Sequence, residues 1–240
     1  MSSFVDLLPR ETRTVPAESP ATATWPDRQA PAALPWSLES FAKQQIRGLV
    51  EQVFLASPLS PRQVAFCPVD GGVEILPICL QIGEVIARHS PGAVCVVDAV
   101  PRYHAEILSG VHTVASSCAQ RFGALRDSAE QLSESLWFMP SDVFCADEHP
   151  PSAIWLRARL AELRLEFDYT VLASPEASQS EGATLGSLAD GLVLVLRANF
   201  TRRVTAQKVR KKLSAANVQL LGTILTARTF PIPEALYKRL

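Results

Sequence analysis

The chain has 240 residues, of which 48% are apolar and 20% charged, with a formal net charge of −1 at pH 7. This composition suits one sizeable folded domain, and the near-neutral charge gives no overall argument for a nucleic-acid partner or an anionic membrane. The five cysteines are scattered and form no Cys-x-x-Cys pair, which argues against a disulfide or zinc framework and predicts reduced thiols in a cytoplasmic protein. No cleavable signal sequence is visible, and no apolar run approaches membrane-spanning length.

Residues 1–36 are rich in Pro, Ala, Thr and Ser without a sustained period, and we predict a disordered tail. Trp25 and Trp36 stand out in it, either as anchors or as incidental aromatics. The domain is predicted to occupy residues 37–240. It opens with a helix over Ser37–Leu55, whose apolar stripe would pack on a sheet.

The segment Val64–Asp98 organises the rest of the chain. Val64–Cys67 predicts a short strand, and Pro68–Gly72 a tight loop with two adjacent glycines. From Glu74 onward apolar residues recur at helical spacing, and Pro77 is tolerated because it lies in the first turn. The apolar run Ala93–Val97 then predicts a strand buried in a parallel sheet. The segment is therefore a βαβ unit, and the loop after its first strand is where such folds bind phosphate.

The later elements alternate between strands and helices. Residues 103–133 are helix-prone without a resolved pattern, and His104 and His112 lie there without a matching ligand set. The helix over residues 151–166 would place Ile154, Leu160 and Leu163 on one side. Further strands are predicted at residues 136–140, 167–173, 192–196 and 219–225. Together these elements predict an α/β fold, a three-layer, doubly wound and mostly parallel sheet.

A basic helix is predicted over residues 201–216, with Thr201 as a helix cap. Between Arg197 and Lys212 there are seven basic residues and no acidic one. Such a charge run is either a solvated face or a contact surface for an acidic partner or a membrane.

The loop lacks the groups that a phosphate-binding P-loop needs. In the pattern Gly-x-x-x-x-Gly-Lys-Ser/Thr, the lysine neutralises phosphate and the hydroxyl binds Mg²⁺. With Gly71 as the second glycine, the lysine position falls on Gly72 and the hydroxyl position on Val73. From the loop alone, a plain strand–helix turn remains an equal reading. Asp98, at the end of the next strand, would orient water, hold a metal or cap a helix.

Five segments in the same order resemble the bacterial tyrosine kinase (BY-kinase) family of capsule and exopolysaccharide biosynthesis, which belongs to the MinD/ParA-like P-loop ATPases. The resemblance covers about residues 37–240, and the five segments read, in chain order, VCVVDAVPR, FDYTVLASP, LADGLVLVLRANFTRR, QLLGTILT and PIPEALYKRL. The resemblance implies the P-loop NTPase fold of the MinD/ParA-like type.

The chain differs from the family at the positions that bind nucleotide and metal in the family. Besides Gly72 and Val73, the Walker B aspartate falls on Ala173, the second Asp of the Asp-x-Asp pair on Val100, and the asparagine after the last strand on Thr226. Asp98 and Arg102 keep their types. The kinases' tyrosine-rich tail is also missing, with only Tyr237 near the end.

We therefore expect a pseudo-ATPase with a vestigial nucleotide site formed by Asp70, Gly71, Gly72, Val73, Asp98, Arg102 and Ala173. No catalytic residue, metal or cofactor is predicted. The resemblance implies partners: a membrane chain-length regulator (polysaccharide co-polymerase), an active kinase paralogue, or further copies of the chain, with recruitment to the inner membrane by such a partner and no nucleic acid.

Two alternatives stay open. One is an active ATPase or protein tyrosine kinase of the same pathway, using ATP and Mg²⁺ with Asp70 and Asp98 sharing the metal. The other is a MinD/ParA-like positioning protein, although no lysine occurs between Lys43 and Lys208.

Overall fold

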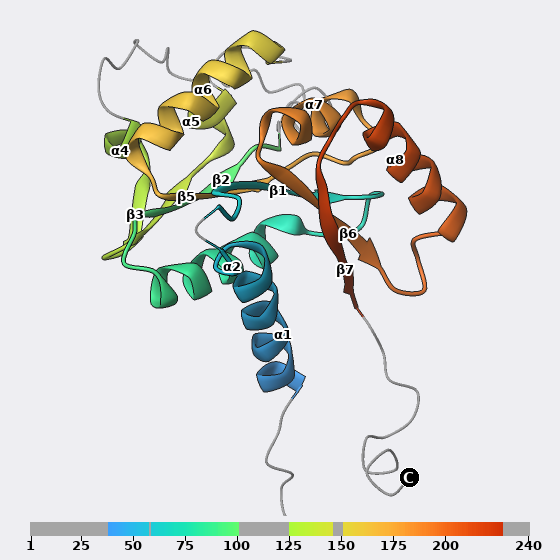
Figure 1. Ribbon diagram of the computed structural model, residues 1–240, viewed down its shortest axis with the longest axis horizontal. Helices are drawn as coiled ribbons and strands as arrows, with labels where there is room; N and C mark the ends of the chain where they lie inside the picture. The colour runs from blue at the N-terminus through green and yellow to red at the C-terminus, as the bar shows by residue number, and fades with distance from the viewer. Residues whose placement is uncertain (1–37, 58, 101–124, 146–150, 228–240) are drawn as a thin grey trace, which may run out of the picture. The chain divides into compact units, whose positions relative to one another are not determined.

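The computed structural model describes residues 38–57, 59–100, 125–145 and 151–227. Within them a seven-stranded sheet lies between two layers of helices (Figure 1), so the predicted three-layer α/β architecture is confirmed. The predicted tail, His104, His112, Arg102 and Tyr237 lie outside the described residues.

The sheet has the strand order β3-β4-β2-β5-β1-β6-β7. Six strands are parallel, and β3 runs antiparallel to β4 at one edge. The strands are β1 (Gln63–Pro68), β2 (Val94–Asp98), β3 (Glu130–Ser133), β4 (Leu136–Met139), β5 (Tyr169–Ala173), β6 (Gly191–Arg197) and β7 (Leu220–Thr226).

Helices cover both faces of the sheet. On one face lie α1 (Leu38–Val53) and α2 (Ile75–His89); the other side carries α4 (Leu125–Ser128), α5 (Ser141–Cys145), α6 (Ala153–Glu166), α7 (Ser180–Leu188) and α8 (Arg203–Ala215). Because successive strand side chains alternate between faces, the core divides in two. Val64 and Phe66 of β1 pack toward α1 and α2, whereas Ala65 and Cys67 pack toward α6, α7 and α8.

Two predicted details are wrong. Ile154 is 85% exposed, and α6 buries Leu156, Leu160 and Leu163 instead. Thr201 does not cap α8, whose N-cap is Arg202; the Thr201 hydroxyl bonds to the loop after β1. The position of Pro77 in the first turn of α2 is confirmed.

The Ala189-Asp190-Gly191 segment gains a structural role. The Asp190 carboxylate accepts hydrogen bonds from the amides of Arg62 (2.9 Å) and Gln63 (2.8 Å) at the start of β1, and its other oxygen accepts one from Arg164 of α6. One side chain thus ties together β1, α6 and the start of β6.

The four described cysteines are free and buried, as predicted. Among the helices that the structure describes, none combines the length and the apolar character needed to cross a bilayer.

Candidate functional site

The loop between β1 and α2 forms the centre of the candidate site. Its backbone turns at Gly72, where φ is +98°, a conformation that residues with a Cβ adopt only with strain. The helix α2 follows at Ile75, so its first amides and their positive dipole end face the loop. This geometry matches the strand–loop–helix arrangement that the sequence predicts.

A pocket of about 230 Å³ opens beside this loop. It lies at the carboxyl edge of the parallel strands, where ligands bind in open α/β sheets. Three segments supply its walls: the loop after β1, the residue Val100 after β2, and the segment from the end of β5 into α7. The lining residues are Pro68, Asp70, Gly71, Gly72, Val73, Ile75, Val100, Ser174, Pro175, Glu176, Gln179 and Glu181.

Three charged side chains of the described residues line this pocket, and each is acidic: Asp70, Glu176 and Glu181. The Glu176 carboxylate lies against the loop, since a Cβ added at Gly71 would meet its Oε1 at 3.1 Å. Among the described residues no Lys or Arg lines the pocket. These three carboxylates repel a polyphosphate, whereas the dipole of α2 attracts one.

The loop is held from its other side by the segment between β6 and α8. Thr201 Oγ1 donates to Asp70 Oδ1 at 2.9 Å, and Arg197 Nη1 donates to the carbonyl oxygen of Gly72 at 3.3 Å. The guanidinium of Arg197 also stacks on the Phe200 ring, 5.2 Å from its centroid. Arg197 is thus a cation near the loop, but its guanidinium binds the backbone and the ring instead of facing the pocket.

The strand ends beside the pocket carry the remaining predicted residues. Asp98 and Ala173 are paired neighbours on β2 and β5, and both side chains are buried. Asp98 Oδ1 accepts a hydrogen bond from the Val100 amide at 3.2 Å. Neither residue lines the pocket; Val100 and Ser174, which follow them, do. Thr226 lies apart, at the end of β7, and donates to the Leu196 carbonyl.

Cys67, near the end of β1, carries a buried thiol. Burial raises the pKa of its thiol to about 12, against the opposing effect of a hydrogen bond with Ser174. Its Sγ lies 2.8 Å from the Pro175 carbonyl oxygen. The thiol is therefore neutral at physiological pH and bonded to backbone.

Of the predicted site residues that the structure describes, Asp70, Gly71, Gly72 and Val73 line the pocket, whereas Asp98 and Ala173 do not. Glu176 and Glu181, which enter from the segment after β5, were not among the predicted site residues. Their position just beyond a predicted parallel strand was the signal, because the carboxyl ends of parallel strands meet at one edge. No group of three or more His, Cys, Asp and Glu side chains within the described ranges is arranged to hold a metal ion.

Comparison with known proteins gives matches among solved structures. A scan of protein-family models finds no match, and no curated protein matches the sequence. The kinase domain of VpsO superposes with a TM-score of 0.59 at 18% identity, covering 80% of this chain and 98% of that domain. The kinase domain of the Escherichia coli tyrosine kinase ETK gives 0.57 at 14% identity, covering 80% and 79%.

A cell division protein has a similar structure. MinD of Aquifex aeolicus gives a TM-score of 0.52 at 17% identity, covering 74% of this chain and 72% of MinD. The structural neighbours are thus tyrosine kinase domains and a MinD-type protein, as the sequence resemblance implied. The chain has the α/β fold that the VpsO and ETK kinase domains share with MinD, the P-loop NTPase type of the MinD/ParA branch.

Proposed function

We propose that this chain is a catalytically degenerate, BY-kinase-like protein that acts as a regulatory or scaffolding subunit in exopolysaccharide or capsule biosynthesis and export. Its fold is that of kinase domains such as those of VpsO and ETK. Its loop, however, carries Gly72 and Val73 where the family has a lysine and a hydroxyl, and no Lys or Arg among the described residues lines the pocket.

The observation that carries this proposal is the acidic lining of the pocket. Glu176, Glu181 and Asp70 surround the place where a triphosphate would lie, and no described Lys or Arg lines it. A charge-assisted hydrogen bond contributes about 1.5–3 kcal/mol. Loss of the lysine and of the hydroxyl at Gly72 and Val73 therefore weakens nucleotide binding by about two to four orders of magnitude, before repulsion by the carboxylates is counted.

The partner assignment follows from the resemblance. A membrane chain-length regulator or an active kinase paralogue would bind this chain, and the chain would act through that contact instead of through phosphoryl transfer. A regulatory subunit needs an intact scaffold, and the fully buried central strands support this.

A complementation experiment in the host separates a scaffold from an enzyme. Deleting the gene is expected to lower polysaccharide yield, and the wild-type chain or Asp98→Asn is expected to restore it equally. Asn is the matched replacement, since its side-chain oxygen still accepts the Val100 amide while the charge that a metal would need is gone. Full restoration by wild type with none by a stably folded Asp98→Asn would overturn the proposal in favour of an active enzyme.

A second measurement tests the pathway. The purified chain, tethered to beads, is incubated with the detergent-solubilised chain-length regulator encoded by the host and with an unrelated membrane protein as control. Selective retention of the regulator, or of the kinase paralogue tested in the same way, is expected. Retention of neither partner would contradict the scaffolding role.

A further inference from the structure

We infer that α8 forms a binding surface for anionic phospholipid membranes. The surface, called the basic face below, consists of Arg202, Arg203, Lys208, Arg210 and Lys211 with the exposed apolar side chains Phe200 and Val204. This inference does not depend on the proposed function, since no residue of the basic face lines the pocket, although Phe200 lies beside Gly72 of the loop.

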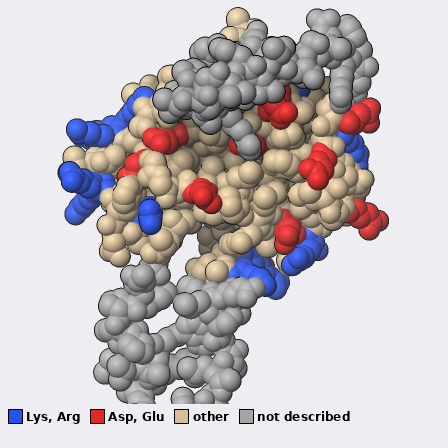
Figure 2. All heavy atoms as spheres, turned by 180° about the vertical axis from the view of Figure 1, so that it is seen from behind, with Lys and Arg blue, Asp and Glu red and all other residues tan. Residues whose placement is uncertain are grey.

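The basic face carries a local excess of charge. Seven of the chain's 23 Lys and Arg lie in the segment from Arg197 to Lys212, which has no Asp or Glu. The rest of the sequence contains the other 16 Lys and Arg and all 24 Asp and Glu. The near-zero net charge thus hides a strongly basic segment on an acidic molecule. Figure 2 shows a group of Lys and Arg side chains at the left edge of the view, on the side where α8 lies, while acidic side chains and further Lys and Arg are spread over the rest.

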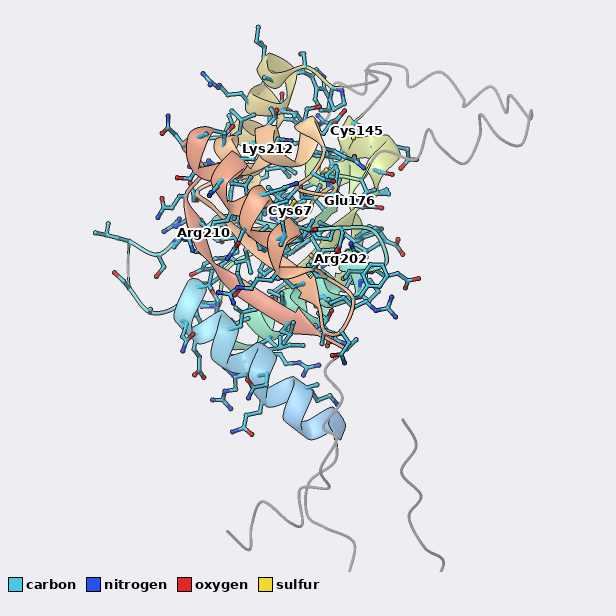
Figure 3. The ribbon with its side chains drawn as sticks, turned by 90° about the vertical axis from the view of Figure 1, so that its right-hand side faces the viewer. Cys67, Cys145, Glu176, Arg202, Arg210 and Lys212 are labelled. Carbon is cyan, nitrogen blue, oxygen red and sulfur yellow. The ribbon has the colours of Figure 1, made fainter. Side chains whose placement is uncertain are left out.

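The cations of the basic face are available for an external partner. All five are exposed, and among the described residues none has an Asp or Glu oxygen within 4.0 Å. Lys212 is different, because its Nζ donates to the carbonyls of Ser178 (2.8 Å) and Gln179 (3.2 Å). Figure 3 shows Arg202 and Arg210 along α8 on the side that faces the viewer, with Lys212 in the same view.

The helix geometry spreads the charges over a broad surface. α8 buries Val209 and Leu213, and successive residues are rotated by about 100°. Val204 and Lys211 are seven residues apart and so follow one line down the exposed side, with Lys208 and Arg210 flanking it. The cations are therefore distributed around a broad part of the exposed side of the helix, which suits an extended anionic surface better than a single carboxylate.

The apolar side chains favour a membrane over an acidic protein or nucleic acid. Phe200 is 54% and Val204 62% exposed, and both lie at the amino-terminal end of α8 beside Arg202 and Arg203. Interfacial helices combine Lys and Arg with exposed aromatic and aliphatic residues that enter the headgroup region. Near an anionic leaflet each Lys or Arg increases binding about fivefold.

Sedimentation of the full chain with vesicles tests this inference. Binding is expected to vesicles of phosphatidylcholine with phosphatidylglycerol and not to vesicles of phosphatidylcholine alone. Raising NaCl from about 0.05 M to about 0.5 M is expected to release the protein, because screening shortens the range of these charges.

Matched variants locate the surface. The triple variant Lys208→Gln, Arg210→Gln, Lys211→Gln is expected to lose binding about a hundredfold. A control triple variant removes the same amount of charge from α1, α2 and α6: Arg47→Gln, Arg88→Gln, Arg157→Gln. It is expected to keep most of the vesicle binding. Val204→Ser is expected to weaken binding about threefold to tenfold, and Ile154→Ser, an exposed isoleucine of α6, to have little effect.

Several results would overturn the inference. The inference is contradicted if the two triple variants lose binding equally or if the chain binds neutral vesicles. It is also contradicted if the chain binds polyglutamate or duplex DNA more tightly than the anionic vesicles. Folding of each variant is checked by circular dichroism. The single change Lys211→Gln, at an exposed position, provides a milder variant with an expected loss of about fivefold. Since vesicle binding and MgATP binding are measured separately, failure of one leaves the other proposal standing.

Discussion

The hydroxyl of Thr201 donates a 2.9 Å hydrogen bond to the carboxylate of Asp70, joining the loop after β1 to the segment before α8. The same hydroxyl oxygen accepts the Arg197 amide at 3.0 Å. Together with the hydrogen bond from Arg197 to the Gly72 carbonyl, these contacts attach the glycine loop to the segment that leads from β6 to α8. The loop is therefore braced by protein groups.

Replacing Thr201 tests this bracing. Thr201→Val keeps the shape and removes both hydrogen bonds of the hydroxyl, so we expect the free energy of unfolding to fall by about 1–2 kcal/mol. Thr201→Ser, which keeps the hydroxyl, serves as the control and is expected to stay within about 0.5 kcal/mol of wild type. Urea unfolding measures both, and equal stabilities of the Val and Ser variants would show that the bond contributes nothing.

Restoring the missing lysine is expected to fail. At Gly72 the φ of +98° strains any side chain, and an added Cβ would lie 3.3 Å from Arg197 Nη1. We expect Gly72→Lys to destabilise the protein by about 1–2 kcal/mol and to give no MgATP binding.

Gly48→Lys provides the matched control for that substitution. It adds the same side chain within α1, where a Cβ meets nothing within 4 Å, and is expected to stabilise the protein by about 0.5–1 kcal/mol. A Gly72→Lys variant as stable as wild type would show that the loop rearranges freely.

Helices and strands with a strong hydrophobic pattern are predictable from the sequence, and those without such a pattern are not. β1, α2 and β2 follow from apolar runs and helical spacing. The edge strand β3 was missed because all of its side chains are exposed, so no alternation marks it. α7 was missed because of its two glycines; they are needed for packing, since a Cβ at Gly186 would lie 2.4 Å from Leu192 Cδ1.

The site is predictable only where one segment forms it. Asp70 to Val73 are contiguous and were identified, whereas Glu176 and Glu181 reach the pocket only through the pairing of β1 with β5. The sequence alone predicts that Thr201 caps a helix, because Thr is favoured at the N-cap position. Its contact with Asp70, 131 positions earlier in the chain, depends on the tertiary fold.

The network around Asp190 predicts a pH dependence of stability. Burial alone raises the pKa of this carboxyl, but the amides of Gln63 and Arg62 and the charge of Arg164 outweigh it, so the pKa is lowered below its usual 3.8. Because the pKa of Asp190 is lower in the folded than in the unfolded state, its carboxylate stabilises the protein at pH values above the unfolded pKa. This stabilisation is lost as pH falls through the folded pKa.

We therefore expect Asp190→Asn to reduce the free energy of unfolding by about 1–2 kcal/mol at pH 7, allowing for partial solvent screening. The difference from wild type should shrink as pH falls below about 4. Urea unfolding at several pH values measures it, and a constant difference across that range would refute the role of the charge.

The buried thiols predict slow chemical labelling. Burial raises the pKa of Cys145 to about 11 and that of Cys67 to about 12, and it also raises the pKa of Cys79 and Cys95. In a Cys118→Ser variant, which leaves only these four, we expect almost no reaction with a thiol reagent at pH 8 until the protein is denatured, because thiolate is the reactive form. Rapid labelling of the native variant would contradict the packing described.

Calorimetric titration of the full chain with MgATP and with MgADP addresses the nature of the pocket most directly, with the ETK kinase domain as a positive control. With Asp70, Glu176 and Glu181 lining the pocket, we expect no heat of binding to this chain under conditions in which the control binds. A dissociation constant in the low micromolar range would contradict the assignment of a vestigial nucleotide site.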